Sequence, residues 1–363
     1  MLEEEILLGS CQCEPSADGS EVPNVTLILI FLPLLSLSGV IFNCISLAVF
    51  ARKESRQSTT NIYLTVLSLS DMGICLSGIF IITADSLRSY SPVVNEIFAL
   101  LIPYLAPFGM AFQMLSVYVT VLAAVDCYVS VSTKRHKSGY CRPQVAKRVL
   151  GAVLVVVCMY NFLIFWELKT QRCFDENTNT TKLEVCPTEM RLDDTYITVY
   201  RGYMYTLSMA IIPFTLLSTL TIGIVRNLSR GKWNHVLSFD AKSRFSLQSS
   251  VVRETPRAFL TKSRIEDRSS GSSPLMLVMV IALFLACNVV SLVVNILEMT
   301  SDLVSFSAQM ILIDVGNVLV VFNATANFFV YVIFSESYRA SLRTIFWESS
   351  KYEEDPPLKI TQL

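Results

Sequence analysis

The chain has 363 residues, of which 52% are hydrophobic and only 16% are charged. About a quarter of the residues of soluble globular proteins are charged, so this chain is short of polar surface. The formal net charge of −1 argues against a nucleic-acid partner, because proteins that bind nucleic acid carry a surplus of basic residues.

The hydrophobic residues are gathered into seven blocks, each free of charge or interrupted by a single acid. A helix needs about 20 apolar residues to cross the roughly 30 Å hydrocarbon core of a bilayer, so each block can span it once. We therefore expect an all-α membrane protein, a seven-transmembrane helix bundle over residues 25–334. The predicted spans are residues 25–51, 61–84, 97–131, 147–166, 198–226, 273–298 and 303–334.

Basic residues gather on one side of the predicted membrane. The loops 51–60, 132–148, 226–272 and 335–363 hold 23 of the 29 Lys and Arg residues. Cytoplasmic loops carry such an excess, so we expect the tail 1–24 outside the plasma membrane and the C-terminus inside. The outer loops carry 17 acids against 6 bases. These acids either keep the outer face solvated or attract a cationic ligand, because a field of one sign concentrates the opposite charge.

Polar side chains occur inside the predicted spans, where each is costly in hydrocarbon and is expected to face the bundle interior. Asp71 and Asp314 are acids within apolar blocks, and a carboxylate at mid-span needs a proton, a cation or several hydrogen-bond donors. Amides and hydroxyls at such places also link helices by hydrogen bonds. They are Asn43, Gln113, Ser116, Asn288, Asn295, Asn317, Asn323 and Asn327.

Short motifs in these spans resemble those of rhodopsin-like G-protein-coupled receptors. In chain order they are Gly39-Val-Ile-Phe-Asn43, Leu67-Ser-Leu-Ser-Asp71, Asp126-Cys127-Tyr128 in place of Asp-Arg-Tyr, Pro213, and Asn327-Phe-Phe-Val-Tyr331 in place of Asn-Pro-x-x-Tyr. Their order across the seven spans identifies the chain as a member of this family. The resemblance implies a short amphipathic eighth helix at 335–347, a cytoplasmic tail at 348–363 and coupling to a heterotrimeric G protein.

Three segments are similar to a narrower group, the invertebrate FMRFamide-type neuropeptide receptors. They are Tyr160 to Glu167, Phe284 to Asn288, and Asn323 to Tyr331. This resemblance implies an extracellular ligand that is a short peptide ending in Arg-Phe-amide, and its guanidinium suits the acidic outer loops.

Other functions are less compatible with the sequence. The two histidines, His136 and His235, both fall in cytoplasmic loops, so no histidine-based catalysis is expected inside the bundle and the chain is not expected to be an enzyme. A transporter or channel using Asp71 and Asp314 is a weaker alternative, because seven spans do not form an even inverted repeat. A non-signalling or constitutively active peptide receptor is the other alternative.

Departures from the family pattern concern activation. Cys127 replaces the arginine that the family inserts toward the G protein, and Thr221 replaces the tyrosine that meets this arginine in the active state. Coupling is therefore expected to be altered, weakened or constitutive, unless other cytoplasmic contacts suffice. The residues assigned to coupling are Asp126, Cys127, Tyr128, Thr221 and Tyr331.

Two sites are predicted, and the first is implied by the resemblance. Asp71, Ser116, Asn323 and Asn327 match the residues that hold Na⁺ in the family, and oxygen ligands suit this hard cation. Na⁺ as an allosteric ion is the one cofactor considered. The predicted peptide pocket consists of Asp85, Gln113, Tyr205, Asn295, Glu298, Asp314 and Asn317. Glu298 and Asp314 flank the turn between spans six and seven, where both can meet an arginine of the ligand.

The cysteines also depart from the family pattern, because Ile102 stands where the family has a disulfide-bonded cysteine at the top of span three. Four cysteines are expected on the oxidising outer side: Cys11, Cys13, Cys173 and Cys186. Either Cys173 and Cys186 bond to each other, or both bond to the N-terminal pair.

Two further sequence motifs concern modification and partners. Asn24 and Asn179 lie in outward Asn-x-Thr acceptors for glycosylation, and Asn179 is preferred because Asn24 lies close to the bilayer. The C-terminal residues Thr361 and Leu363 resemble the ligand of a PDZ domain, in which an extended tail adds as a strand to a sheet edge. An unused solvated tail is the alternative.

Overall fold

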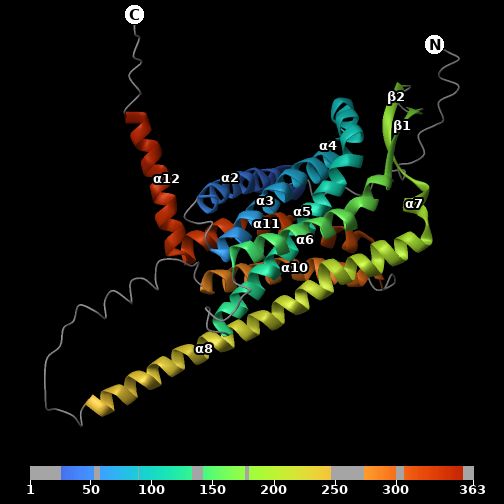
Figure 1. Cartoon of the computed structure of the whole chain (residues 1–363). Helices are drawn as coiled ribbons and strands as arrows, with labels where there is room; N and C mark the ends of the chain where they lie inside the picture. Colours follow the sequence, from blue (N-terminus) through green and yellow to red (C-terminus); the bar gives the residue numbers. More distant parts are fainter. Residues whose placement is uncertain are drawn as a thin grey trace, which may run out of the picture.

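The computed structural model describes residues 26–52, 58–88, 90–132, 142–175, 180–246, 274–299 and 306–354. Within them, seven helices are long and apolar enough to cross a membrane, which confirms the predicted all-α, seven-span fold. The helices pack side by side in one bundle (Figure 1). The spans are Ile28–Phe50, Thr59–Arg88, Pro92–Ser132, Pro143–Trp166, Tyr196–Arg230, Pro274–Val294 and Ile311–Phe334.

The helical elements follow these spans. In chain order they are η1 (Thr26–Phe31), α2 (Leu32–Phe50), α3 (Thr59–Ser77), η3 (Gly78–Thr83), α4 (Ala84–Arg88), α5 (Pro92–Ser132), α6 (Pro143–Asn161), η5 (Phe162–Trp166), α7 (Glu189–Leu192), η6 (Tyr196–Met204), η7 (Thr206–Ile211), α8 (Ile212–Ser246), α10 (Pro274–Met299), α11 (Phe306–Phe334) and α12 (Glu336–Glu354). Pro92, Pro143 and Pro274 are the first residues of their helices. Proline suits this position because it has no N–H group to leave unsatisfied.

Span five is widened near its proline. The π-helical turns η6 and η7 lead into α8, and η7 ends at Ile211, two residues before Pro213. A proline inside a helix removes one backbone hydrogen bond and displaces the carbonyl of the preceding turn. The widened turn accommodates this local mismatch without breaking the span.

Span three is central, since α5 packs against α3, α6, α8 and α10. The main hydrophobic core includes Leu64, Val119, Leu217, Ile281 and Tyr331, each at most 1% exposed. A smaller cluster of Ile74, Cys75, Val321 and Ala324 joins spans two and seven. These contacts hold the spans together along their shared interior.

A β-hairpin covers one end of the bundle. Strands β1 (Leu168–Asp175) and β2 (Thr180–Pro187) are antiparallel, with Leu168 opposite Pro187 and Asp175 opposite Thr180. We call this end of the bundle the hairpin end and the opposite end, where α12 lies, the α12 end (Figure 1).

Hydrogen bonds attach the hairpin to span three. Thr170 Oγ1 donates to the carbonyl of Ala99 at 2.5 Å, and Asn95 Nδ2 donates to the carbonyl of Leu183 at 2.9 Å. Ile102, which stands where the family has a cysteine, is buried in the same stretch of α5. The hairpin therefore docks on α5 through polar contacts of its side chains and backbone.

The strand register separates the two hairpin cysteines. Cys173 lies opposite Lys182, and Cys186 lies opposite Lys169, so the cysteines are four positions out of register. At a rise of about 3.3 Å per residue and about 5 Å between strands, their Cα atoms are roughly 14 Å apart, against a limit near 7 Å for a disulfide. Both cysteines are nevertheless disulfide-bonded. The structure thus excludes a Cys173–Cys186 bond, while Cys11 and Cys13 lie outside the described residues.

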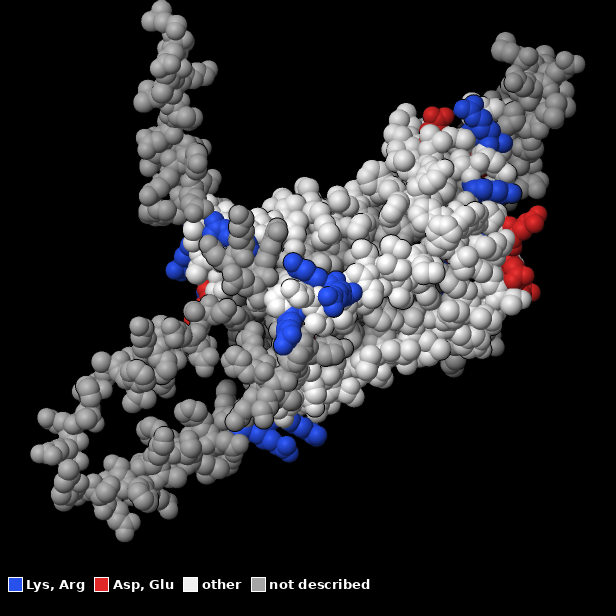
Figure 2. All heavy atoms as spheres, viewed as in Figure 1, with Lys and Arg blue, Asp and Glu red and all other residues white. Residues whose placement is uncertain are grey.

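The surface of the bundle is apolar between two charged ends. Figure 2 shows Lys and Arg toward the α12 end of the visible face and again beside the hairpin, with Asp and Glu mainly at the hairpin end. Large apolar side chains are exposed on the fourth span, including Val155, Val156, Met159 and Phe162, each 57% exposed or more. Such a band suits contact with lipid chains.

Two helices are longer than the predicted boundaries. α8 continues to Ser246, although the predicted span ends at 226, where the long third cytoplasmic loop, predicted over 226–272, begins. α12 extends to Glu354, beyond the predicted eighth helix at 335–347 and into the predicted tail. The predicted boundaries were placed where the hydrophobic residues end, and both extensions are polar. Hydrophobicity therefore located the end of the membrane-spanning segment and not the end of the helix.

Candidate ligand pocket and polar core

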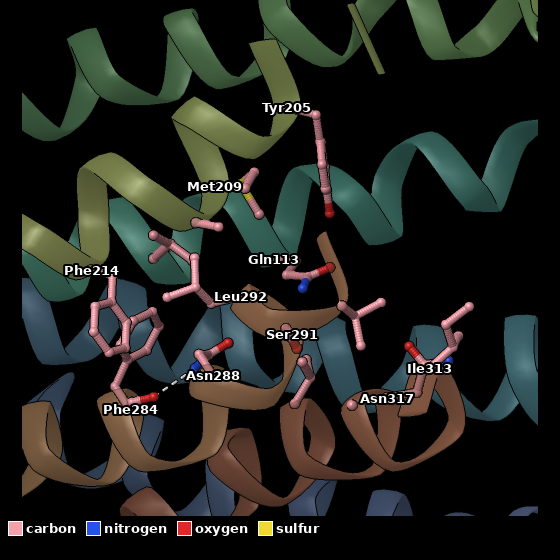
Figure 3. A pocket seen from close by; sticks show the side chains of 15 residues that line it. Gln113, Tyr205, Met209, Phe214, Phe284, Asn288, Ser291, Leu292, Ile313 and Asn317 are labelled. Atoms are coloured by element: carbon pink, nitrogen blue, oxygen red, sulfur yellow. Dashed lines mark hydrogen bonds between the residues drawn. The ribbon is translucent and has the colours of Figure 1, made fainter. Parts of the chain in front are cut away.

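A cavity of about 210 Å³ lies among spans three, five, six and seven. Its polar lining comes from Gln113 on α5, Tyr205 on span five, Asn288 and Ser291 on α10, and Asn317 on α11. Figure 3 shows Tyr205, Gln113 and Asn288 reaching from three spans toward the same space. The apolar lining is Val117, Met209, Ala210, Phe214, Phe284, Leu292, Val294, Ile313, Gly316 and Val320.

A second cavity of about 240 Å³ lies between spans two, three and seven. Gln113, Asn317 and Val320 line both cavities, so these three residues form the wall between them. Two amides at this junction can donate to and accept from a group in either cavity.

The lining of both cavities carries no charged residue within the described part of the chain. Asn288 Nδ2 donates to the carbonyl of Phe284 at 2.8 Å, which holds its side chain in a fixed orientation. The first cavity therefore combines neutral hydrogen-bonding groups with the aromatic rings of Phe214 and Phe284.

The predicted pocket residues fall into three groups. Gln113, Tyr205 and Asn317 come together at the cavities. Asp85 is exposed and forms an ion pair with Arg88 at 2.8 Å, while Asp314 follows the cavity residue Ile313 without lining either cavity. The side chains of Asn295 and Glu298 lie outside the described part of the structure, so their ligand contacts stay predictions, as do those of Asp85 and Asp314.

A buried ion pair near the hairpin end was not singled out from the sequence. Glu167, at the end of span four, is 2% exposed and accepts hydrogen bonds from Tyr196 Oη at 2.6 Å and from Arg201 Nη2. Arg191 Nε lies 3.8 Å from the same carboxylate. Arg201 Nη1 also contacts Met110 Sδ, at 3.4 Å, and Met110 lines the second cavity. The pair thus links spans three, four and five beside the cavities.

The sequence contained only a weak signal for this pair. Glu167 closes an apolar run, and Arg201 lies at the start of the next span, so the sequence pattern alone places both among the charges of the outer loops. Pairing across 34 positions requires knowledge of how the two helix ends meet.

The predicted sodium-site residues gather around Asp71, which is fully buried. Ser116 Oγ donates to its Oδ1 at 2.7 Å, and Asn327 Nδ2 donates to its Oδ2 at 2.8 Å. Asn323 is buried one helical turn from Asn327, and within the described residues the Oδ1 atoms of both amides have no hydrogen-bond donor. A buried carboxylate with uncommitted amide oxygens nearby is a donor set that fits a hard cation.

Near the α12 end, Asp126 is satisfied by hydroxyls. Its Oδ2 accepts from Thr59 Oγ1 at 2.9 Å and from Thr60 Oγ1 at 3.2 Å, and both threonines begin α3. Cys127 is 2% exposed within the core, whereas Tyr128 is 37% exposed. The missing arginine is thus accompanied by a contact between spans two and three.

The remaining coupling residues are also placed. Thr221 Oγ1 donates to the carbonyl of Leu217 on its own helix at 2.6 Å. Tyr331 is fully buried, and its ring packs edge-on against Phe50 with the centroids 5.2 Å apart. Its Oη has no hydrogen-bond partner among the described residues.

Four predicted sites lie outside the described residues. They are the glycosylation acceptors Asn24 and Asn179 and the PDZ-type residues Thr361 and Leu363.

Comparison with known proteins agrees with this architecture. The family model of the 7 transmembrane receptor (rhodopsin family) matches residues 42–331. The probable G-protein coupled receptor frpr-1 of Caenorhabditis elegans is 30% identical over 336 residues, which cover 88% of this chain and 79% of the relative. The FMRFamide receptor of Drosophila melanogaster is 26% identical, over 91% of this chain and 55% of the relative.

A third relative, the FMRFamide peptide receptor frpr-18 of Caenorhabditis elegans, is 23% identical over 84% of this chain and 66% of its own length. The chain thus spans between about half and four fifths of the relatives it matches. The family match runs from within span one to within span seven and covers most of the chain. The chain is thus a multi-pass plasma-membrane protein, and it is a receptor and not an enzyme. The chain belongs to the rhodopsin family of seven-transmembrane receptors.

Proposed function

We propose that this receptor binds a short amidated neuropeptide ending in Arg-Phe-amide and activates a heterotrimeric G protein. The observation that carries the proposal is the neutral polar lining of the 210 Å³ cavity, with the amides of Gln113, Asn288 and Asn317. Two relatives named as FMRFamide receptors support the same class of ligand.

The terminal amide of such a peptide matches this lining. A carboxamide has two donors and one acceptor, and the side-chain amides offer the complementary groups. The phenylalanine ring would pack against Met209, Phe214 and Phe284. A free carboxylate would instead be desolvated in a cavity without a basic residue in its lining, which is costly.

The test compares a synthetic peptide ending in Arg-Phe-amide with the same peptide as the free acid. We expect the amide to activate G-protein nucleotide exchange at a concentration at least tenfold lower, a difference of about 1.4 kcal/mol. Equal potency of the two peptides would contradict the proposed role of the neutral lining.

A charge introduced into the cavity sharpens this test. Gln113→Lys should reduce or reverse the preference for the amide, because an ammonium group can pair with the carboxylate of the free acid. Leu192→Lys is a matched control, since it adds the same charge at an exposed position of α7, away from the cavity lining. The control should keep the preference of the unmodified receptor.

Coupling through the altered Asp126-Cys127-Tyr128 motif is part of the proposal. The hydroxyl contacts of Asp126 support a resting contact between spans two and three that does not need the arginine. We expect the peptide to raise G-protein nucleotide exchange in membranes containing the receptor. If the peptide binds but exchange stays at its basal level, the chain is a non-signalling receptor; high exchange without peptide would make it constitutively active.

We also propose Na⁺ as an allosteric ion held by Asp71, Ser116, Asn323 and Asn327. The contacts of Asp71 and the two buried amide oxygens support this donor set. An ion that prefers the resting state lowers the population of the active state. Agonist affinity should fall as Na⁺ replaces choline at fixed ionic strength, and Asp71→Asn should remove this fall.

The orientation, with the N-terminus outside, stays part of the proposal. An N-terminal epitope should bind antibody on intact cells, and a C-terminal epitope should require permeabilisation. A shift in mobility after glycosidase treatment should disappear in Asn179→Gln if that acceptor is used.

The partner at the C-terminus is a separate proposal, based on Thr361 and Leu363. Leu363→Ala should abolish binding of the tail to a PDZ domain while leaving peptide binding intact. Failure of the unmodified tail to bind any member of a PDZ-domain panel would remove this partner.

A further inference from the structure

We infer that Cys173 and Cys186 form two disulfide bonds with Cys11 and Cys13, which staple the N-terminal tail to the hairpin. Both hairpin cysteines are disulfide-bonded, and the strand register keeps them too far apart to bond to each other. Each must therefore have a partner elsewhere.

Elimination leaves few partners. Cys44, Cys75, Cys127, Cys158 and Cys287 are free thiols. The remaining cysteines in the sequence are Cys11, Cys13 and Cys141. Cys141 comes two residues before α6, whose 19 residues and the following η5 separate it from the hairpin. At 1.5 Å per residue, the start of α6 is about 30 Å or more from the hairpin, which is too far for a disulfide from a residue two positions before it.

The hairpin presents its two cysteines in one direction. Cys173 and its partner Lys182 share a face of the sheet, and Cys186, four residues further along β2, lies on that same face because side chains alternate with a period of two. Thr170, whose hydroxyl bonds to Ala99 of α5, lies on the opposite face. The cysteines therefore point away from the face that docks on span three.

The spacing of Cys11 and Cys13 suits the distance between the two hairpin cysteines. In an extended chain, residues two apart have side chains on one face and Cα atoms about 7 Å apart. Each disulfide spans up to about 7 Å between Cα atoms, so the total reach is roughly 20 Å against the 14 Å to be bridged. Cys11 and Cys13 can therefore reach both hairpin cysteines at once, which neither could do alone.

The length of the tail permits this connection. Twelve residues lie between Cys13 and Thr26, where η1 begins, and the thirteen steps from one to the other can extend over about 44 Å. Neighbouring helices are about 8–10 Å apart, so three helix spacings from span one toward the hairpin need about 30 Å. The two disulfides would thus close a covalent loop that includes the tail and spans one to four.

The first test is mass spectrometry of the full-length receptor, digested without reductant. We expect peptides containing Cys11 and Cys13 to be linked to both Cys173 and Cys186, and to separate after reduction. A fragment linking Cys173 to Cys186, or links between two copies of the chain, would overturn the inference.

The second test cuts the tail on living cells. A protease site replaces residues 16–21, between Cys13 and span one, in a receptor with an N-terminal epitope. After cleavage, the epitope should stay on the cell until reductant is added. Its release before reduction would contradict the staple.

Matched variants separate the bond from an incidental association. In Cys11→Ser/Cys13→Ser the epitope should leave on cleavage, with retention falling at least tenfold, and Cys173 and Cys186 should become reactive to a membrane-impermeant maleimide. Cys141→Ser should behave like the unmodified receptor. Retention of the epitope in the double variant would overturn the inference even if the variant expresses poorly, because the assay scores only receptor at the cell surface.

Discussion

The hairpin end and the α12 end of the bundle each bury an acid between spans, but the two acids are satisfied by different chemistry. Glu167 has a guanidinium partner in Arg201 and a phenol partner in Tyr196. Asp126 has two threonine hydroxyls and a neutral neighbour, Cys127. Removing one partner of a buried ion pair costs more than removing one neutral donor, so the hairpin end is the more strongly fixed of the two.

The same comparison indicates at which end of the bundle the spans can move apart more easily. A carboxylate held by hydroxyls can exchange one donor for another with little change in charge, whereas Glu167 without Arg201 would be a largely unbalanced buried charge. We therefore expect spans two and three to move apart near the α12 end more readily than spans four and five move apart near the hairpin.

The largest effect is expected for Arg201→Ala. It leaves the buried Glu167 without its nearest cation and should lower the free energy of unfolding by roughly 2–5 kcal/mol. The lower end of this range applies because solvent reaches part of the Arg201 side chain. Heating of the detergent-solubilised receptor, followed through thiol exposure, measures this loss. Glu167→Gln/Arg201→Gln should recover part of it, and equal losses in both variants would show that the charge pair is not the cause.

Asp126→Ala should have a smaller effect. It removes the acceptor of Thr59 and Thr60, and leaving two buried hydroxyls without it costs about 1–3 kcal/mol. The same thermal assay applies, together with basal nucleotide exchange, which should rise. A loss that exceeds that of Arg201→Ala would reverse the ranking of the two ends.

Tyr338→Phe tests the contact of α12 with span one. Tyr338 Oη and Ser46 Oγ share a hydrogen bond of 3.0 Å, so the substitution should cost about 0.5–1.5 kcal/mol. Burial raises the pKa of Tyr338 to about 12 from 10.0. The folded state thus holds this proton more tightly, and the contribution is full below pH 10 and lost as the pH rises from 10 toward 12.

The measurement for Tyr338 is thermal stability at several pH values. Between pH 6 and 9 the difference between Tyr338→Phe and the unmodified receptor should be constant, and above pH 10 it should shrink. A difference that already changes between pH 6 and 9 would point to another titrating group.

The smallest effect is expected for Tyr331→Phe. The ring is fully buried, and its hydroxyl has no partner among the described residues, so no hydrogen bond is lost and the free energy of unfolding should stay the same or rise by about 0.5 kcal/mol. A loss above 1 kcal/mol would reveal an ordered water or another partner bound to this hydroxyl.

Hydrophobicity made the spans predictable, because membrane length constrains each block independently of its neighbours. The residues around Asp71 were equally predictable from the sequence, since they stand at fixed places in motifs of the family. Contacts between Asp71, Ser116 and Asn327 agree with that placement.

Features that depend on how separate segments meet were not predictable. The pairing of Glu167 with Arg201 depends on the approach of spans four and five, and the separation of Cys173 from Cys186 depends on the strand register. The sequence also placed Asp314 in the pocket, whereas its neighbour Ile313 lines the cavity. Adjacent residues on a helix face different directions, so the choice between them needs the rotation of α11.

The extension of α8 has a mechanical consequence. The apolar span ends at Arg230, but the helix continues for 16 residues to Ser246, which is about 24 Å at 1.5 Å per residue. Such a continuous rod acts as a lever: a tilt of about 5° at the bilayer surface displaces its tip by roughly 2 Å over that length. Small rearrangements around the cavity, where Tyr205 and Met209 belong to the same span, would thereby become larger displacements far from it.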